Sequence, residues 1–128
     1  MKKFFAGALV FTAQAIFSAH ITYAAGVDMD LMQEIEEIND SLASNIALQK
    51  TDASLTDARQ LKDLFVVVEE HYVKEPDAED AVVISRDSLR LATSIIGFVS
   101  QGDFEKAAIF ATDLSRACRA CHTFYRED

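Results

Sequence analysis

Two cysteines and a histidine near the C-terminus have the spacing most specific for chemistry in this chain. They occur as Cys118-Arg119-Ala120-Cys121-His122, and the sequence contains no other cysteine. On a helix, Cys121 lies about 60° to one side of Cys118 and His122 about 40° to the other, so all three share one edge. Cys-x-x-Cys-His is typical of c-type haem attachment through two thioethers. We therefore expect one covalent haem c, with His122 as the proximal iron ligand.

Four other interpretations of these residues stay open at this point. A thioredoxin-like redox pair needs a strand-helix-strand setting, which the sequence does not indicate. A structural zinc site needs four ligands, and only His71 adds to the motif in the chain beyond residue 24. The third is a chance or surface disulfide, although a bridge over two residues closes almost no loop. The fourth is a helical bundle in which the motif is inert.

The N-terminal residues predict export from the cytoplasm. Lys2 and Lys3 give a positively charged start, and residues 4–19 form an apolar run without charge. Thr22-Tyr23-Ala24 then places small residues at the two positions that a signal peptidase inspects, which predicts cleavage after Ala24. A retained membrane anchor is the alternative, but the run is short for a bilayer span of about 20 residues.

These signals divide the chain into a secretory signal peptide, residues 1–24, and a four-helix-bundle c-type cytochrome domain, residues 25–128. Cleavage removes two lysines and no acid, so the formal net charge falls from −9 to −11. This charge argues against binding to nucleic acid or to an anionic membrane surface. We expect a periplasmic protein without stable membrane insertion once the signal is removed.

Helical periodicity dominates the sequence after the signal. In the first segment, Leu31, Ile35, Ile38, Leu42 and Ile46 recur at steps of three and four, which predicts one apolar stripe. Similar stripes mark three further segments, and short connections between helices favour antiparallel neighbours. The sequence therefore predicts an all-α fold, an antiparallel up-down-up-down four-helix bundle. Its segments are expected at about 27–50, 55–74, 77–101 and 104–126.

The expected boundaries depend on a few polar residues, one glycine and the single proline. Residues 51–56 are expected to form a polar break between the first two helices. Pro76 is expected to close the second helix and Asp77 to cap the third. Gly102 is expected to end the third helix in a left-handed conformation, and Asp103 to cap the fourth.

A haem motif on the last of four helices resembles the cytochrome c′ (class II cytochrome c) family, because class I cytochromes c carry it near the N-terminus. The similarity continues after the histidine, where Thr123-Phe124-Tyr125-Arg126 is similar to the family's x-x-aromatic-basic ending. The resemblance implies that Tyr125 packs near the haem edge and that Arg126 tunes the proximal imidazole. Arg126 also fits a solvated cation that stabilises the helix dipole.

The start of the first helix adds to this resemblance. Leu31-Met32-Gln33-Glu34 is similar to the family's first helix, which often begins with a Leu-Met pair. In the six-coordinate relatives a methionine at this place is the sixth iron ligand, which makes Met32 the candidate distal ligand. In the five-coordinate members an apolar residue leaves the distal face free for small gases. Core filling is the commoner use of methionine, and Met29 and His71 are further distal candidates.

Three functions follow from these expectations. The first is single-electron transfer by a mono-haem cytochrome, with acidic residues that steer it to a redox partner with a basic docking surface. The second is a five-coordinate haem protein that binds nitric oxide or carbon monoxide. The third is a haem-free helical interaction module. No nucleophile, paired-carboxylate or metal-hydrolase constellation stands out, so no enzyme is expected. Members of the family often form homodimers, and the resemblance allows one here.

Overall fold

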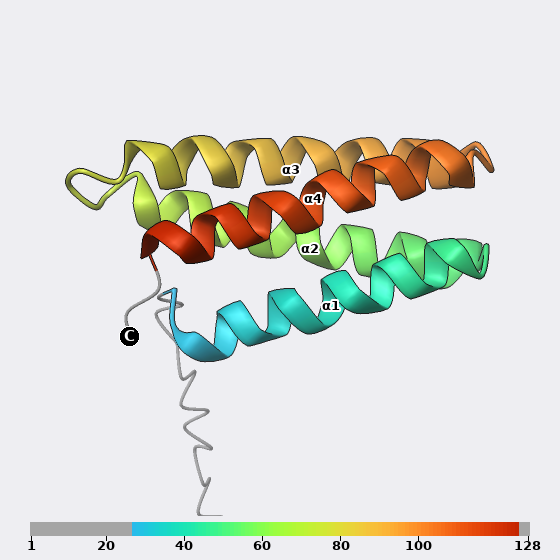
Figure 1. The fold of residues 1–128 in the computed structure, drawn as a ribbon, viewed down its shortest axis with the longest axis horizontal. Coiled ribbons are helices and arrows are strands. Elements are labelled where there is room, and N and C mark those ends of the chain that lie inside the picture. The colour runs from blue at the N-terminus through green and yellow to red at the C-terminus, as the bar shows by residue number, and fades with distance from the viewer. Residues whose placement is uncertain (1–26, 126–128) are drawn as a thin grey trace, which may run out of the picture.

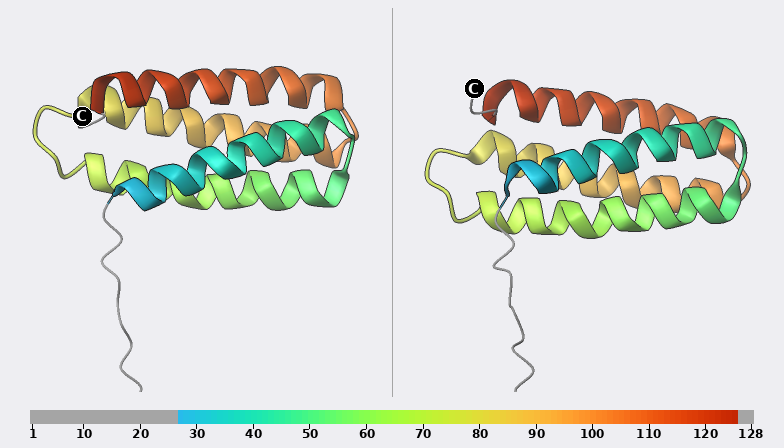
Figure 2. Two further views of the ribbon diagram at one scale, coloured as in Figure 1. Left: turned by 60° about the horizontal axis from the view of Figure 1, so that its bottom comes forward. Right: turned by 90° about the horizontal axis from the view of Figure 1, so that it is seen from below.

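A computed structural model describes residues 27–125 of the chain, with side chains as far as His122. The described residues form four helices and no strand: α1 (Met29–Ala47), α2 (Thr51–Tyr72), α3 (Glu79–Ser100) and α4 (Phe104–Tyr125). Consecutive helices run in opposite directions along the bundle (Figures 1 and 2). Each packs on two neighbours, with α1 closing the bundle against α4. The predicted antiparallel four-helix bundle is therefore confirmed.

The core consists of the apolar stripes that the periodicity predicts. On α1, Ile35, Leu42 and Ile46 are buried, whereas Leu31 and Ile38 are half-buried and pack against the same core. A buried aliphatic side chain of this size contributes about 1.5–3 kcal/mol relative to an exposed one. Small buried residues on the other helices add to this core, and they let the helices approach closely: Ser54, Ala58, Ala81, Ser85, Ser88, Ala92, Ala107 and Ala111.

The first connection differs from the prediction, because residues 51–56 belong to α2. Only residues 48–50 connect α1 to α2, and Gln49 turns the chain in the left-handed region with φ 52°. Ser54 is fully buried, so this polar side chain faces the core. The prediction of a break at 51–56 was wrong because polar composition indicated a loop where the residues form the first turns of a helix.

The second connection also corrects the prediction. α2 ends at Tyr72, before Pro76 is reached, and Ala78 rather than Asp77 occupies the N-cap of α3. Asp77 instead adopts φ 58°, a left-handed conformation that aspartate tolerates better than most residues. Asp77 therefore turns the chain toward α3 and does not cap the helix.

The third connection confirms the prediction. Gly102 ends α3 with φ 74°, and Asp103 Oδ1 accepts a hydrogen bond from the Lys106 N–H at 3.1 Å. At the start of α1, Asp28 caps the helix by accepting from the Leu31 N–H at 2.9 Å. The predicted signal peptide, residues 1–24, lies outside the described residues. Within the described part of the chain, no helix is both long and apolar enough to cross a membrane.

Replacement of Leu114 by alanine tests the core. Leu114 on α4 has no exposed surface, and Leu114→Ala should lower the free energy of unfolding by about 3 kcal/mol through lost burial and an unfilled cavity. Ile109 on the same helix is 55% exposed, so Ile109→Ala should cost less than about 0.5 kcal/mol. Urea unfolding followed by helical circular dichroism measures both values. Equal losses in the two variants would contradict this packing.

A pH-dependent melting experiment tests the Asp103 cap. Hydrogen bonds from the Lys106 backbone and side chain lower the pKa of the Asp103 carboxyl. Because the folded-state pKa lies below the unfolded one, the carboxylate stabilises the fold at neutral pH, and this stabilisation disappears as the pH falls through the folded-state pKa. Asp103→Asn keeps a neutral cap. Its melting temperature should be below that of the wild type at about pH 7, and the two should converge as the pH falls through the lowered folded-state pKa of Asp103. A constant difference would exclude the charge effect.

Candidate functional site

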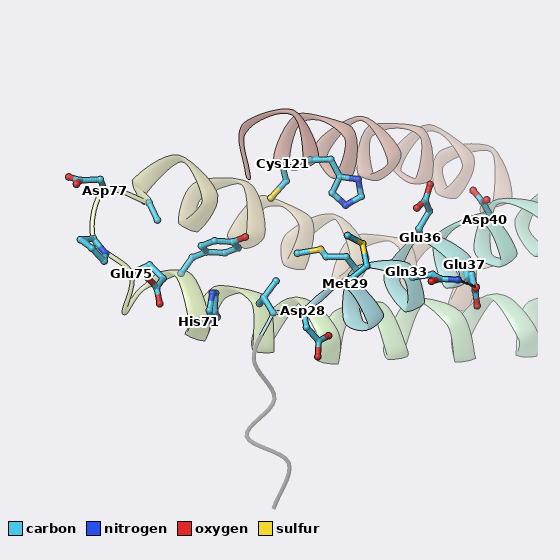
Figure 3. A pocket seen from close by; sticks show the side chains of 16 residues that line it. Asp28, Met29, Gln33, Glu36, Glu37, Asp40, His71, Glu75, Asp77 and Cys121 are labelled. Atoms are coloured by element: carbon cyan, nitrogen blue, oxygen red, sulfur yellow. Dashed lines mark hydrogen bonds between the residues drawn. The ribbon is translucent and has the colours of Figure 1, made fainter. Parts of the chain in front are cut away.

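One end of the bundle contains a cavity of about 960 Å³. The first half of α1, the end of α2 with the connection to α3, and the last turns of α4 line this cavity. Figures 1 and 2 show α1 and α4 well separated at this end, and Figure 3 shows side chains from three sides around the space. Its volume is at the upper end of the range of about 300–1,000 Å³ for ligand pockets. The cavity can therefore hold a group much larger than a metal ion.

The structure brings the predicted site residues together at this cavity. Cys121 and His122 line it from α4, Met32 from α1 and His71 from α2. Cys121 points from α4 into the space, and His71 reaches it from the opposite side (Figure 3). Met29 also lines the cavity but is 66% exposed at the first position of α1. Five predicted candidates on three different helices therefore border one space.

A small apolar recess adjoins the cavity and contains the other cysteine. Cys118 lies there with Phe65 and Val68, and the recess has room for about one water molecule, at 20 Å³. Met32, Cys121 and His122 line both the recess and the larger cavity. Met29 and His71 line only the larger one. Met32 and His122 therefore share the wall where the apolar interior meets the open space.

The motif residues occupy α4 as predicted, near its end. α4 extends to Tyr125, so the whole Cys-x-x-Cys-His motif is helical and its three functional residues leave one edge of the helix. Arg126 and the side chain of Tyr125 lie outside the described residues, and their expected roles stay predictions.

Burial determines the protonation state of the two cysteines. Both are free thiols, with Cys121 buried and Cys118 half-buried. Burial raises the pKa of the Cys118 thiol to about 11, and the neighbouring Cys121 adds to this effect. Burial also raises the pKa of Cys121. Cysteines that catalyse redox exchange have lowered pKa values, so the environment of this pair disfavours the thioredoxin-like interpretation.

Six carboxylates line the cavity, which net charge alone did not predict. Four lie on α1 or just before it, and two lie in the α2–α3 connection: Asp28, Glu36, Glu37, Asp40, Glu75 and Asp77. Among the residues that the structure describes, no lysine or arginine lines the cavity. The signal in the sequence is the stretch 28–40, which contains six acidic residues and no basic one. The mouth of the cavity is therefore strongly negative.

A buried polar contact beside the cavity was also missed. Asn39 on α1 is 7% exposed, and its Nδ2 donates to Ser115 Oγ on α4 at 2.8 Å. Asn39 Oδ1 is buried without a hydrogen-bond partner. Asn39 interrupts an otherwise apolar face of α1 next to Ile35 and Leu42, and this interruption is the only sign of the contact in the sequence.

No protein-family model, curated protein or solved structure matches this chain. Among the residues whose side chains are described, no group of three or more His, Cys, Asp and Glu could hold a metal ion. A function for the chain therefore has to be argued from the four-helix bundle, the cavity and the chemistry of the residues that line it.

Proposed function

We propose that this chain is a periplasmic mono-haem c-type cytochrome that carries single electrons. One observation carries the proposal: Cys121, His122 and Met32 line a single large cavity, and Cys118 lies in the recess that adjoins it. A haem held there would supply an iron that changes its oxidation state by one electron.

The donor set fits a covalently attached haem. Each thiol, of Cys118 and of Cys121, can add across one vinyl group, with the sulfur bonding to carbon and the thiol hydrogen going to the other carbon. Both thiols lie beside the cavity and are free for this addition. The imidazole of His122 follows on the same helix edge and is the proposed proximal ligand. The cavity volume of about 960 Å³ suits a macrocycle rather than a bare ion.

Met32 is the proposed distal ligand. It shares both the cavity and the recess with His122, whereas Met29 and His71 share only the cavity. Met32 is half-buried against the core, so its side chain is held more firmly than that of the exposed Met29. With a haem bound, a thioether ligand from Met32 would raise the reduction potential, and Met32 and His122, both on packed helices, would limit the change in geometry between redox states.

The acidic mouth of the cavity supports the proposed type of partner. Six carboxylates, with no basic side chain among the described lining residues, create a negative potential where an electron would enter or leave. A partner with a basic docking surface would be steered to this end, with association that weakens as salt is added. The four-helix bundle also agrees with the proposed relation to the cytochrome c′ family.

Binding of nitric oxide or carbon monoxide by a five-coordinate haem is a second candidate. The apolar recess favours it, because Ile35, Phe65 and Val68 provide a water-poor space of the size of a small molecule beside Met32, the residue proposed for the distal side. The two functions differ in whether Met32 binds the iron, which spectroscopy can determine.

Histidine variants test the proposed proximal ligand. In protein made by a host that matures c-type cytochromes, His122→Ala should lose the wild-type optical spectrum, because the iron loses its side-chain ligand while the two thioethers remain. His71→Ala is the matched control, since His71 lines the same cavity from α2. Its spectrum should equal that of the wild type. The reverse pattern, or a wild type without haem, would contradict the proposal.

Methionine variants separate the two candidate functions. Met32→Ala should abolish the weak far-red band that marks methionine ligation in the oxidised protein. It should also lower the reduction potential by on the order of 0.1 V, a fraction of the ~0.8 V that axial ligands span. Met29→Ala, three residues away, should change neither property. An unchanged spectrum in Met32→Ala would exclude this ligand and favour the gas-binding function.

A further inference from the structure

A directional pair of hydrogen bonds connects α1 to α4 next to the cavity. Asn39 Nδ2 donates to Ser115 Oγ at 2.8 Å, and Ser115 Oγ donates to the Ala111 carbonyl at 3.1 Å. Because the single hydroxyl proton of Ser115 goes to Ala111, its oxygen can only accept from the amide of Asn39. This arrangement fixes which end of the Asn39 amide faces α4.

The proposed iron ligands stand in register with this contact. Met32 precedes Asn39 by seven residues on α1, and His122 follows Ser115 by seven residues on α4. A step of seven residues rotates the helix by two full turns to within about 20° and advances it by about 10.5 Å. Met32 therefore lies on the same face of α1 as Asn39, and His122 lies on the same face of α4 as Ser115. Because α1 and α4 are antiparallel, the step back from Asn39 to Met32 and the step forward from Ser115 to His122 go toward the same end of the bundle. Met32 and His122 therefore lie at one level on facing helix surfaces.

A second pair of residues supports the same register. Glu36 precedes Asn39 by three residues, and Cys118 follows Ser115 by three. Glu36 lines the cavity and Cys118 lines the adjoining recess, so both residues lie at the same end of the bundle. Burial is the main cause of the raised pKa of the Cys118 thiol, and the negative charge of Glu36 adds a smaller contribution. The two helices therefore keep this register from Asn39 toward the cavity.

Asn39 is a poor choice for stability alone. Only 7% of its surface is exposed, yet its Oδ1 has no hydrogen-bond partner. A buried acceptor without a partner lowers the stability of a fold. A buried asparagine in a helix interface is known to specify register at a cost in stability, because an apolar side chain packs equally well after a shift. Asn39 lies on α1 between the cavity-lining residues Glu37 and Asp40, and its contact with α4 gives such a specification a use.

We infer that Asn39 is a positioning residue, whose hydrogen bond to Ser115 fixes the register of α1 on α4 and holds Met32 opposite His122. This inference rests on the proposed haem function. Asn39 lines neither the cavity nor the recess, so it acts through the helix that carries Met32.

The test compares asparagine variants in the mature, haem-loaded protein. Carbon monoxide competes with Met32 for the reduced iron, so a less firmly held Met32 lets it bind faster. Asn39→Leu should raise the carbon monoxide binding rate about fivefold, the ratio that loss of one net hydrogen bond gives. It should also weaken the far-red methionine band. Because leucine removes the unpaired acceptor, stability to urea should stay the same or rise, which separates positioning from stability.

Asn45 provides the matched control. Its Nδ2 donates to Asp57 Oδ2 at 2.8 Å and connects α1 to α2, away from the residues that line the cavity. Asn45→Ala should leave the carbon monoxide rate and the methionine band unchanged. On the other helix, Ser115→Ala should reproduce the effect of Asn39→Leu, and Ser115→Thr should restore the wild-type rate because it keeps the hydroxyl.

Different outcomes separate this inference from the function on which it rests. A wild type without haem would contradict the proposed function, and the inference with it. A wild type with haem but without the methionine band would overturn the inference, since no iron–sulfur bond would need positioning. The last case is a wild type that has both haem and the methionine band. If its Asn39→Leu and Ser115→Ala variants bind carbon monoxide no faster than Asn45→Ala, the inference is overturned while the proposed function stands.

Discussion

The candidate site depends on one constraint: α1 packs on α4 over only part of the length of α1. Toward the end of α1, Leu42 and Ile46 are buried in the same core as Leu114 of α4. Asn39 and Ser115 then join the two helices by a hydrogen bond. Toward the start of α1 the helices separate around a cavity of about 960 Å³. The bundle is therefore closed at one end and hollow at the other, and the hollow end holds the residues with distinctive chemistry.

The two sides of this cavity differ in character, and the difference suits the proposed function. On the inner side, Cys118 and Cys121 are neutral thiols next to apolar residues, and burial keeps their pKa values high. On the outer side, six carboxylates face the solvent around the mouth. A haem between them would be shielded from water on one side, while its open side would lie in a negative field. A c-type electron carrier needs both properties, a secure cofactor and a charged surface for brief encounters.

The sequence predicted the features that depend on local spacing. Ile35, Leu42 and Ile46 repeat at helical intervals because they must face one core, and this periodicity is visible without a structure. Gly102 and Asp103 were predicted correctly, because a left-handed glycine and a capping carboxylate act within one turn. The spacing of the Cys-x-x-Cys-His motif likewise defines one helix edge, so Cys118, Cys121 and His122 could be placed together.

The features that the sequence did not predict depend on contacts between helices. Asn39 and Ser115 are 76 residues apart, and no local pattern indicates that they meet. The break predicted at 51–56 was wrong because polar residues there form the first turns of α2, and the turns themselves are made by Gln49 and Asp77, which adopt left-handed conformations without being glycine. The gathering of His71, Met32 and the acidic residues around one cavity likewise depends on the register of four helices. Composition gave the sign of the charge, and the fold determined where it lies.

The most direct test of the covalent haem is the intact mass and colour of the exported protein after denaturation. Protein purified from a host that matures c-type cytochromes should carry the mass of one haem on each mature chain. It should also keep its colour in denaturant, because the thioethers of Cys118 and Cys121 survive unfolding. A chain with the plain polypeptide mass and no visible absorption would contradict covalent haem attachment, and electron transfer by this protein with it.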